Sequence, residues 1–253
     1  MNETDFIDIE GLVVRTIIGI FDEERERRQD VVLSLRLFGD FRPAARSDHI
    51  DDAIDYAIER GRVDLDNIVM VGRSGGGYAT MGMYLASRHK LKLALSWVGV
   101  SDLVAWYHQS RTRAPRYRDF IARCTAEDGV FDETKARARS PLYFEAPTSP
   151  NGRIEIFHGI EDGFGGATIP ASHSIRFYNR VVEAFGAVEA RVPEADAIAL
   201  LTKSVPAETS DRLGDRRLFY RRGTEFAELF IFDGAHEMLD DVCFERIEAG
   251  VSP

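Results

Sequence analysis

Residues 68–77 read IVMVGRSGGG, a short apolar run followed by a serine set among glycines. The run predicts a buried strand, and the residues from Gly75 onward predict a helix. A strand that turns sharply into a helix exposes the oxygen of a serine at the turn, and glycines beside it let neighbouring backbones approach closely. Ser74 is therefore a candidate nucleophile, and the amide of Gly75 is a candidate donor to an oxyanion. The alternative is a glycine-rich turn in which Ser74 only caps the helix.

A serine nucleophile needs a base and a group that orients the base, and two later segments supply candidates. Asp162 follows the apolar segment 153–158, and His236 follows the apolar segment 227–232. The order serine, aspartate, histidine is the order of α/β-hydrolases, and open α/β sheets place their sites at the carboxyl ends of strands. We therefore predict a triad of Ser74, Asp162 and His236.

The acid and the base of this triad each have an alternative. Asp102 also follows an apolar segment and competes with Asp162 as the orienting acid. His236 could instead cap the turn before the last helix. Asp233 lies on a predicted strand and is expected to be structural, and His158 is expected to hydrogen-bond backbone groups beneath the site.

From residue 67 onward, strand-like and helix-like segments alternate. Strands are predicted over 67–72, 93–100, 153–158 and 227–232, and helices over 75–88, 102–145, 171–185 and from 237 onward. This alternation predicts an α/β fold with a mainly parallel sheet. The polar segment 186–226 contains two prolines and is predicted to be a loop-rich excursion over the site.

The first 60 residues differ from the rest of the chain in their predicted secondary structure and in their charge. They contain 8 Arg or Lys and 15 Asp or Glu residues, a net charge of −7. Strands are predicted over 6–20 and 31–37, and a helix is predicted from Ser47 or Asp48 to Gly61. We predict two domains, an antiparallel hairpin plus helix over 1–60 and an α/β region over 61–253.

The composition of the 253 residues excludes several classes of protein. No stretch approaches the roughly 18 to 20 apolar residues that a membrane span requires, and the first residues lack the features of a secretory signal. Cys124 and Cys243 form neither a disulfide framework nor a zinc pattern, which favours a cytoplasmic protein. The net charge of −10 argues against a nucleic-acid partner and an anionic membrane surface.

Residues from about 54 to 253 resemble prolyl-oligopeptidase-type α/β-hydrolases. The matching segments are 53–61, 69–78, 157–163 and 232–238. The resemblance implies a serine hydrolase with Ser74 as nucleophile, His236 as base and Asp162 as its orienter. Because members of the family are peptidases and carboxylic-ester hydrolases, the expected substrate is a small ester or a peptide.

Residues 1–60 resemble the amino-terminal half of dihydroneopterin aldolase, a tunnelling-fold enzyme, in segments 9–12, 18–21, 24–29 and 42–56. By position, Glu24 and Tyr56 match the active-site acid and tyrosine of that family. Without the resemblance, Glu24 reads as a charge on a solvated turn and Tyr56 as a packing residue. The resemblance ends before the catalytic lysine of the family, so no aldolase activity is expected from this half-domain.

The hydrolase-like region is also incomplete, because in the family several strands and a helix precede the elbow strand. A loop among them supplies the second oxyanion donor, and losing one such donor lowers the rate by roughly 10²- to 10³-fold. A sheet that begins at the elbow strand also has an apolar edge, which predicts a homo-oligomer unless the hairpin covers that edge. The seam between the two resemblances lies at 53–59, a segment that fits both families.

The predicted function is hydrolysis of an ester or peptide bond without a metal or an organic cofactor. The first alternative is a pterin lyase of the aldolase type that uses Glu24 and Tyr56. The second is a catalytically inactive fusion that only self-associates.

Overall fold

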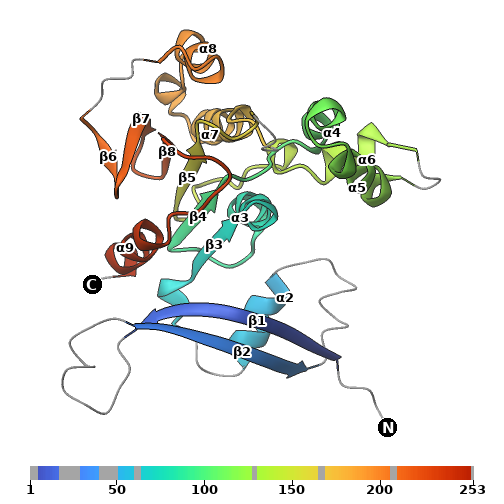
Figure 1. Cartoon of the computed structure of the whole chain (residues 1–253), viewed down its shortest axis with the longest axis vertical. Helices are drawn as coiled ribbons and strands as arrows, with labels where there is room; N and C mark the ends of the chain where they lie inside the picture. Colours follow the sequence, from blue (N-terminus) through green and yellow to red (C-terminus); the bar gives the residue numbers. More distant parts are fainter. Residues whose placement is uncertain are drawn as a thin grey trace. The chain divides into compact units, whose positions relative to one another are not determined.

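A computed structural model describes residues 5–16, 29–39, 51–59, 64–126, 130–164, 169–205 and 210–251. The chain divides into two compact units, Met1–Glu59 and Arg60–Pro253. Figure 1 shows the helices and strands of both units.

Among its described residues, the first unit contains two strands and one helix, as the sequence predicts. Strand β1 (Asp5–Thr16) pairs antiparallel with β2 (Gln29–Gly39), and the register shifts between Ile9 and Leu12. Helix α2 (Asp51–Glu59) has two acidic residues in its first turn, where the helix dipole favours negative charge. The predicted helix start at Ser47 or Asp48 and its end at Gly61 lie outside the described residues.

The second unit is built on a six-stranded sheet with the order β3-β4-β5-β8-β7-β6 (Figure 1). Its strands are β3 (Val69–Arg73), β4 (Leu93–Trp97), β5 (Arg153–Gly159), β6 (Arg212–Leu213), β7 (Arg216–Gly223) and β8 (Ala227–Phe232). Strands β3, β4, β5 and β8 are parallel, and β7 and β6 extend the sheet antiparallel. The predicted mainly parallel α/β sheet is therefore confirmed.

Helices cover both faces of this sheet. The α-helices are α3 (Gly75–Ala86), α4 (Leu103–Arg113), α5 (Pro115–Thr125), α6 (Glu133–Ala138), α7 (Ser172–Ala184), α8 (Glu194–Leu201) and α9 (Asp240–Val251). Short 3-10 helices occupy Leu65–Asn67, Pro141–Tyr143 and Val188–Ala190. In the part of the chain that the structure describes, no helix is long and apolar enough to cross a membrane.

Alternation along the strands divides the core into two clusters. On β8, Leu229 and Ile231 join a cluster with residues of α3 and α7, whereas Phe230 and Phe232 join a second cluster with residues of α9. Successive side chains of a strand point to opposite faces, so strands buried on both sides are apolar throughout. These two layers hold the carboxyl ends of the central strands in fixed positions.

The prediction of a loop-rich excursion over 186–226 is wrong. This segment contains α8, β6 and β7, and β7 pairs with β8 from Leu218 to Gly223. Strand β7 has the sequence RRLFYRRG, and most of its residues are half-buried or exposed. A strand near the edge of a sheet can carry exposed arginines. The polar sequence of this segment is therefore not sufficient evidence for a loop. The last helix also begins later than predicted, at Asp240.

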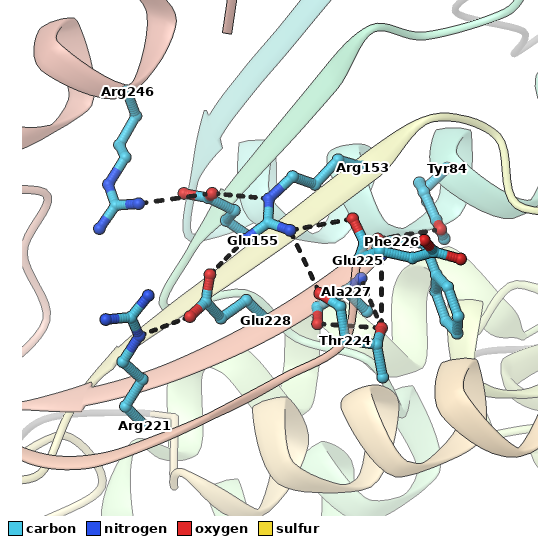
Figure 2. A network of polar contacts seen from close by, with 10 residues as sticks. All are labelled: Tyr84, Arg153, Glu155, Arg221, Thr224, Glu225, Phe226, Ala227, Glu228 and Arg246. Atoms are coloured by element: carbon cyan, nitrogen blue, oxygen red, sulfur yellow. Dashed lines mark hydrogen bonds and ion pairs between the residues drawn. The ribbon is translucent and has the colours of Figure 1, made fainter. Parts of the chain in front are cut away.

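A buried network of charged side chains joins β5, β7, β8 and α9 (Figure 2). Glu155 and Glu228 are register partners on β5 and β8, and only 4% and 5% of their surfaces are exposed. Arg153 donates to both carboxylates, with 2.9 Å between its Nε and Glu155 Oε1. Arg221 Nε lies 2.5 Å from Glu228 Oε1, and Arg246 Nη1 lies 3.6 Å from Glu155 Oε1. The cations thus offset two carboxylates that would otherwise repel each other inside the sheet.

Strand β3 is the terminal strand of the sheet and pairs with β4 alone among the described residues. Val71, at its centre, is 36% exposed. The strand that leads to Ser74 is therefore an edge strand, as expected from the missing hydrolase strands. Self-association at this edge stays a prediction.

Candidate active site

Ser74 lies in a strained turn between β3 and α3. Its φ and ψ angles are 59° and −113°, and a positive φ is unfavourable for a residue with a side chain. Two backbone hydrogen bonds hold this conformation, from Ser74 N to Trp97 O and from Tyr78 N to Ser74 O, each 2.9 Å long. The side chain of Ser74 makes no capping hydrogen bond to α3, which argues against the alternative of a capping serine.

Close backbone contacts explain two of the glycines around Ser74. A Cβ atom added at Gly72 would lie 2.2 Å from the carbonyl carbon and oxygen of Gly76, and one added at Gly77 would lie 2.7 Å from Trp97 O. A Cβ atom added at Gly75 or Gly76 would meet nothing within 4 Å. The turn therefore requires Gly72 and Gly77, and the start of α3 lies open beside Ser74.

Gly72→Ala should destabilise the second unit, whereas Gly76→Ala should not. The methyl group at position 72 would overlap the backbone of Gly76, and overpacking of this kind costs about 1 to 3 kcal/mol. At position 76 the methyl group meets open space and replaces a glycine inside a helix. Urea unfolding of both variants measures the difference. Equal free energies of unfolding would contradict the described packing of the turn.

Asp162 and His236 lie against each other although 74 residues separate them in the sequence. Asp162 is fully buried after β5, and its Oδ1 accepts hydrogen bonds from Gly163 N at 2.9 Å and Ile169 N at 3.1 Å. Its Oδ2 lies 2.6 Å from Nδ1 of His236, whose side chain is 27% exposed. A carboxylate at Nδ1 orients an imidazole and leaves Nε2 as the nitrogen that can take a proton from a nucleophile.

Asp102 and Asp233 have other partners. The side chain of Asp102 caps α4, and its Oδ2 lies 2.7 Å from Arg176 Nη1. Burial opposes ionisation of Asp102, but hydrogen bonds from Ala105 N and Arg176 outweigh it and lower the pKa of this carboxyl. Asp233 pairs with Arg217 at 3.1 Å. Both contacts are structural.

His158 supports the loop that carries Asp162, as expected of a residue beneath the site. Its Nε2 donates to Ile169 O at 3.0 Å, and its Nδ1 accepts a hydrogen bond from the hydroxyl of Ser174 at 2.8 Å. The N–H of Ile169 donates to Asp162, so both backbone polar groups of Ile169 form hydrogen bonds at this site. Ser174 is twelve residues from Asp162, the nearest predicted site residue in the sequence, and its role is visible only in the fold.

His173 is a second buried histidine that the sequence did not single out. Its Nδ1 accepts from Ser101 N at 3.3 Å, and its Nε2 lies 2.8 Å from Gln109 Oε1. Burial lowers the pKa of His173 to about 3, and burial also lowers the pKa of His158. Both imidazoles are therefore neutral in the folded chain at neutral pH.

The free energy of unfolding should decrease as the pH falls below about 6.5, the usual histidine pKa. The unfolded chain then binds protons at His158 and His173, whereas the folded chain does not until the pH approaches the lowered pKa values. Each histidine contributes up to about 1.4 kcal/mol per pH unit. Urea unfolding at pH 7.5 and 5.5 measures the change, and His173→Gln should reduce it. Equal stability at both values would contradict this assignment.

The structure describes some of the remaining predicted site residues, Gly75, Glu24 and Tyr56. Gly75 is the first residue of α3, so its amide lies at the positive end of the helix beside Ser74. Tyr56 lies on α2, and Glu24 lies outside the described residues.

The geometry thus brings two members of the predicted triad into contact and places the third at the same edge. Strands β3, β5 and β8 are parallel members of one sheet, and Ser74, Asp162 and His236 all follow their carboxyl ends. Among the described residues, Ser74 makes no hydrogen bond to Asp162 or His236. A serine hydroxyl, an oriented imidazole and a helix amino terminus at one edge are the groups that acyl transfer requires.

Two family models match the chain. Residues 7–63 match the model for dihydroneopterin aldolase, and residues 45–193 match the model for the prolyl oligopeptidase family. The two matches overlap over 45–63, which includes the predicted seam. The second match includes Ser74 and Asp162 and ends before His236. No curated protein matches the chain.

Several solved structures resemble the chain over about half of its length. An acylaminoacyl peptidase in complex with Z-Gly-Gly-Phe-chloromethyl ketone is 20% identical, with a TM-score of 0.41 over 52% of this chain and 20% of that chain. The acylaminoacyl peptidase of Pyrococcus horikoshii is 19% identical, with a TM-score of 0.42 over 52% and 20%. Prolyl oligopeptidase B from Galerina marginata is 18% identical, with a TM-score of 0.42 over 53% and 18%.

The chain therefore spans about a fifth of the length of the structures that it matches. The match to the second family model covers more than half of this chain and includes the turn at Ser74. The chain belongs to the prolyl oligopeptidase family.

Proposed function

We propose that the second unit hydrolyses an ester or peptide bond through Ser74, His236 and Asp162. The contact of 2.6 Å between Asp162 Oδ2 and His236 Nδ1 carries this proposal, because it fixes the imidazole with Nε2 directed away from the carboxylate. The strained turn at Ser74 and the family match provide independent support.

In the proposed reaction, Ser74 Oγ attacks the carbonyl carbon of the substrate while His236 Nε2 takes the hydroxyl proton. The amide of Gly75 donates to the oxyanion, and the leaving group departs with the proton that His236 returns. Water then attacks the acyl-serine by the same route. The carboxylate of Asp162 stabilises the imidazolium, and the amides of Gly163 and Ile169 hold this carboxylate in place.

The edge position of β3 suggests that this activity is impaired. In the proposed site Gly75 provides one oxyanion donor, and the loss of a second donor costs roughly 10²- to 10³-fold in rate. The open space beside Gly75 and Gly76 fits an oxyanion region without a covering loop.

Hydrolysis of 4-nitrophenyl esters and of matched peptide anilides tests the proposal. The folded chain should release 4-nitrophenol, and Ser74→Ala should reduce the rate to that of buffer. Unchanged hydrolysis by Ser74→Ala would overturn the proposed role of Ser74. A comparison of the ester and anilide rates would show which bond is preferred.

A second candidate function is pterin binding by the first unit, because residues 7–63 match dihydroneopterin aldolase. Glu24 and Tyr56 would contact the pterin. Quenching of neopterin fluorescence by the chain would support this candidate, and it should decrease in Glu24→Ala. Absence of quenching would leave the first unit without a catalytic or binding role.

A further inference from the structure

Helices α4 and α5 form a basic region in an acidic chain. Residues 103–126 contain five arginines and one acidic residue, Asp119, whereas the whole chain has a net charge of −10. The two helices pack on each other and on α6, and the three lie together beyond β4 (Figure 1). This concentration of positive charge indicates a surface that attracts anions.

Two of these arginines line one cavity. The cavity measures about 350 Å³ and is lined by Tyr107, His108, Arg111 and Arg118. The guanidinium carbon of Arg118 lies 5.2 Å from the centre of the Tyr107 ring, and that ring stacks on Phe131 at 3.7 Å. Stacking on aromatic faces holds a guanidinium while its N–H groups stay available.

The charge partners of the two cavity arginines differ from those of Arg137. Within the described residues, Arg111 and Arg118 form no ion pair with a carboxylate, whereas Arg137 pairs with Glu133 at 2.8 Å. Two planar guanidinium groups beside an aromatic wall suit a carboxylate, which can accept parallel hydrogen bonds from each of them.

The helix that carries most of the cavity residues starts at the same edge of the sheet as the proposed active site. Helix α4 begins directly after Asp102, at the carboxyl end of the strand that neighbours β3. His108 is six residues further along α4, which corresponds to about 9 Å at 1.5 Å per residue. An extended peptide that runs along α4 from its start covers this distance in about three residues. The hydroxyl of Tyr78, in the first turn of α3, donates to Arg139 O at 2.5 Å and ties the elbow helix to this region.

We propose that this cavity binds the carboxylate of an aspartate or glutamate side chain in a peptide substrate, a few residues from the scissile bond. This assignment rests on the proposed function, because it treats the cavity as a subsite of the Ser74 centre. Arg111 and Arg118 hold the carboxylate, and the ring of Tyr107 keeps the guanidinium of Arg118 in position.

Binding to the catalytically blocked variant Ser74→Ala tests the subsite without relying on hydrolysis. The probes are fluorescein-labelled glycine-rich hexapeptides with one glutamate, or with glutamine in its place, measured by fluorescence anisotropy. The glutamate peptide should bind at least about tenfold more tightly, as expected for charge-assisted hydrogen bonds. Adding Arg111→Gln or Arg118→Gln should remove this preference.

Arg113→Gln is the matched control, because it removes the same charge from α4 at a position outside the cavity. It should keep the preference for glutamate. Equal binding of the two peptides, or the same loss in Arg113→Gln, would overturn the proposal in favour of a general charge effect. Binding of free glutarate at the same affinity as the glutamate peptide would overturn the assignment to a peptide substrate.

Hydrolysis of matched peptide 4-nitrophenyl esters separates this proposal from the function itself. If Ser74 is active, the ratio of kcat/KM for glutamate over glutamine esters should fall about tenfold or more in Arg111→Gln and stay constant in Arg113→Gln. A constant ratio in both variants would overturn the subsite and leave the hydrolase intact. Glutamate-dependent binding by a chain without hydrolysis would overturn the hydrolase and leave the cavity as an anion site.

Discussion

Asp162→Asn should lower the rate of ester hydrolysis by about 10⁴-fold while the chain stays folded. Asparagine can still accept hydrogen bonds from Gly163 N and Ile169 N through Oδ1, so the loop keeps its two backbone contacts. The amide NH₂ would face His236 Nδ1 and donate to it. The imidazole would then carry its proton on Nε2, where the mechanism needs an acceptor.

Asp233→Asn is the matched control for this variant. Asp233 is three residues from His236 in the sequence, but it pairs with Arg217 and has a side chain that is 44% exposed. A partly exposed pair of this kind contributes little to stability, and the rate should be unchanged. Equal rates for Asp162→Asn and the parent chain, with unchanged circular dichroism, would contradict the role of Asp162.

Glu228→Gln should lower the free energy of unfolding of the second unit by about 3 kcal/mol. The carboxylate of Glu228 is buried between Arg153 and Arg221, and removal of one partner of a buried ion pair leaves uncompensated charge. The value is at the low end for such changes because the side chains of Arg153 and Arg221 are partly exposed, at 33% and 57%. Urea unfolding followed by tryptophan fluorescence provides the measurement.

Glu133→Gln tests whether this effect depends on burial. Glu133 forms a similar contact with Arg137, at 2.8 Å, but about half of each side chain is exposed. Water screens such a pair, so the free energy of unfolding should change little. A similar loss in both variants would contradict the structural role of the network in Figure 2.

The strand-to-helix segments were predictable because each has a strong local pattern. The apolar run before Ser74 and the glycines after it predict β3 and α3 to within two residues of their ends. Asp162 and His236 each follow an apolar strand, so the sequence predicts that they act as a pair. In the structure, Asp162 Oδ2 lies 2.6 Å from His236 Nδ1. In each case, the residues that predict the feature lie within a stretch of about ten residues of the sequence.

The features that the sequence missed depend on contacts between distant segments. Strand β7 reads as a loop because arginine is frequent in it, and its pairing with β8 exists only in the assembled sheet. The partners of His158 and His173 are set by how α7 packs on the strand ends, which no local pattern records. Glu155 and Glu228 lie buried opposite each other on β5 and β8, and this pairing depends on the register of the assembled sheet.

The most direct test of the proposed hydrolase is covalent labelling by a fluorophosphonate probe, with the adduct located by peptide mass spectrometry. Such a probe reacts with an activated serine and hardly with an ordinary hydroxyl. We predict one adduct per chain, on Ser74, that is absent from Ser74→Ala and strongly reduced in Asp162→Asn. A chain that is folded by circular dichroism and carries no adduct on Ser74 would contradict the proposed triad.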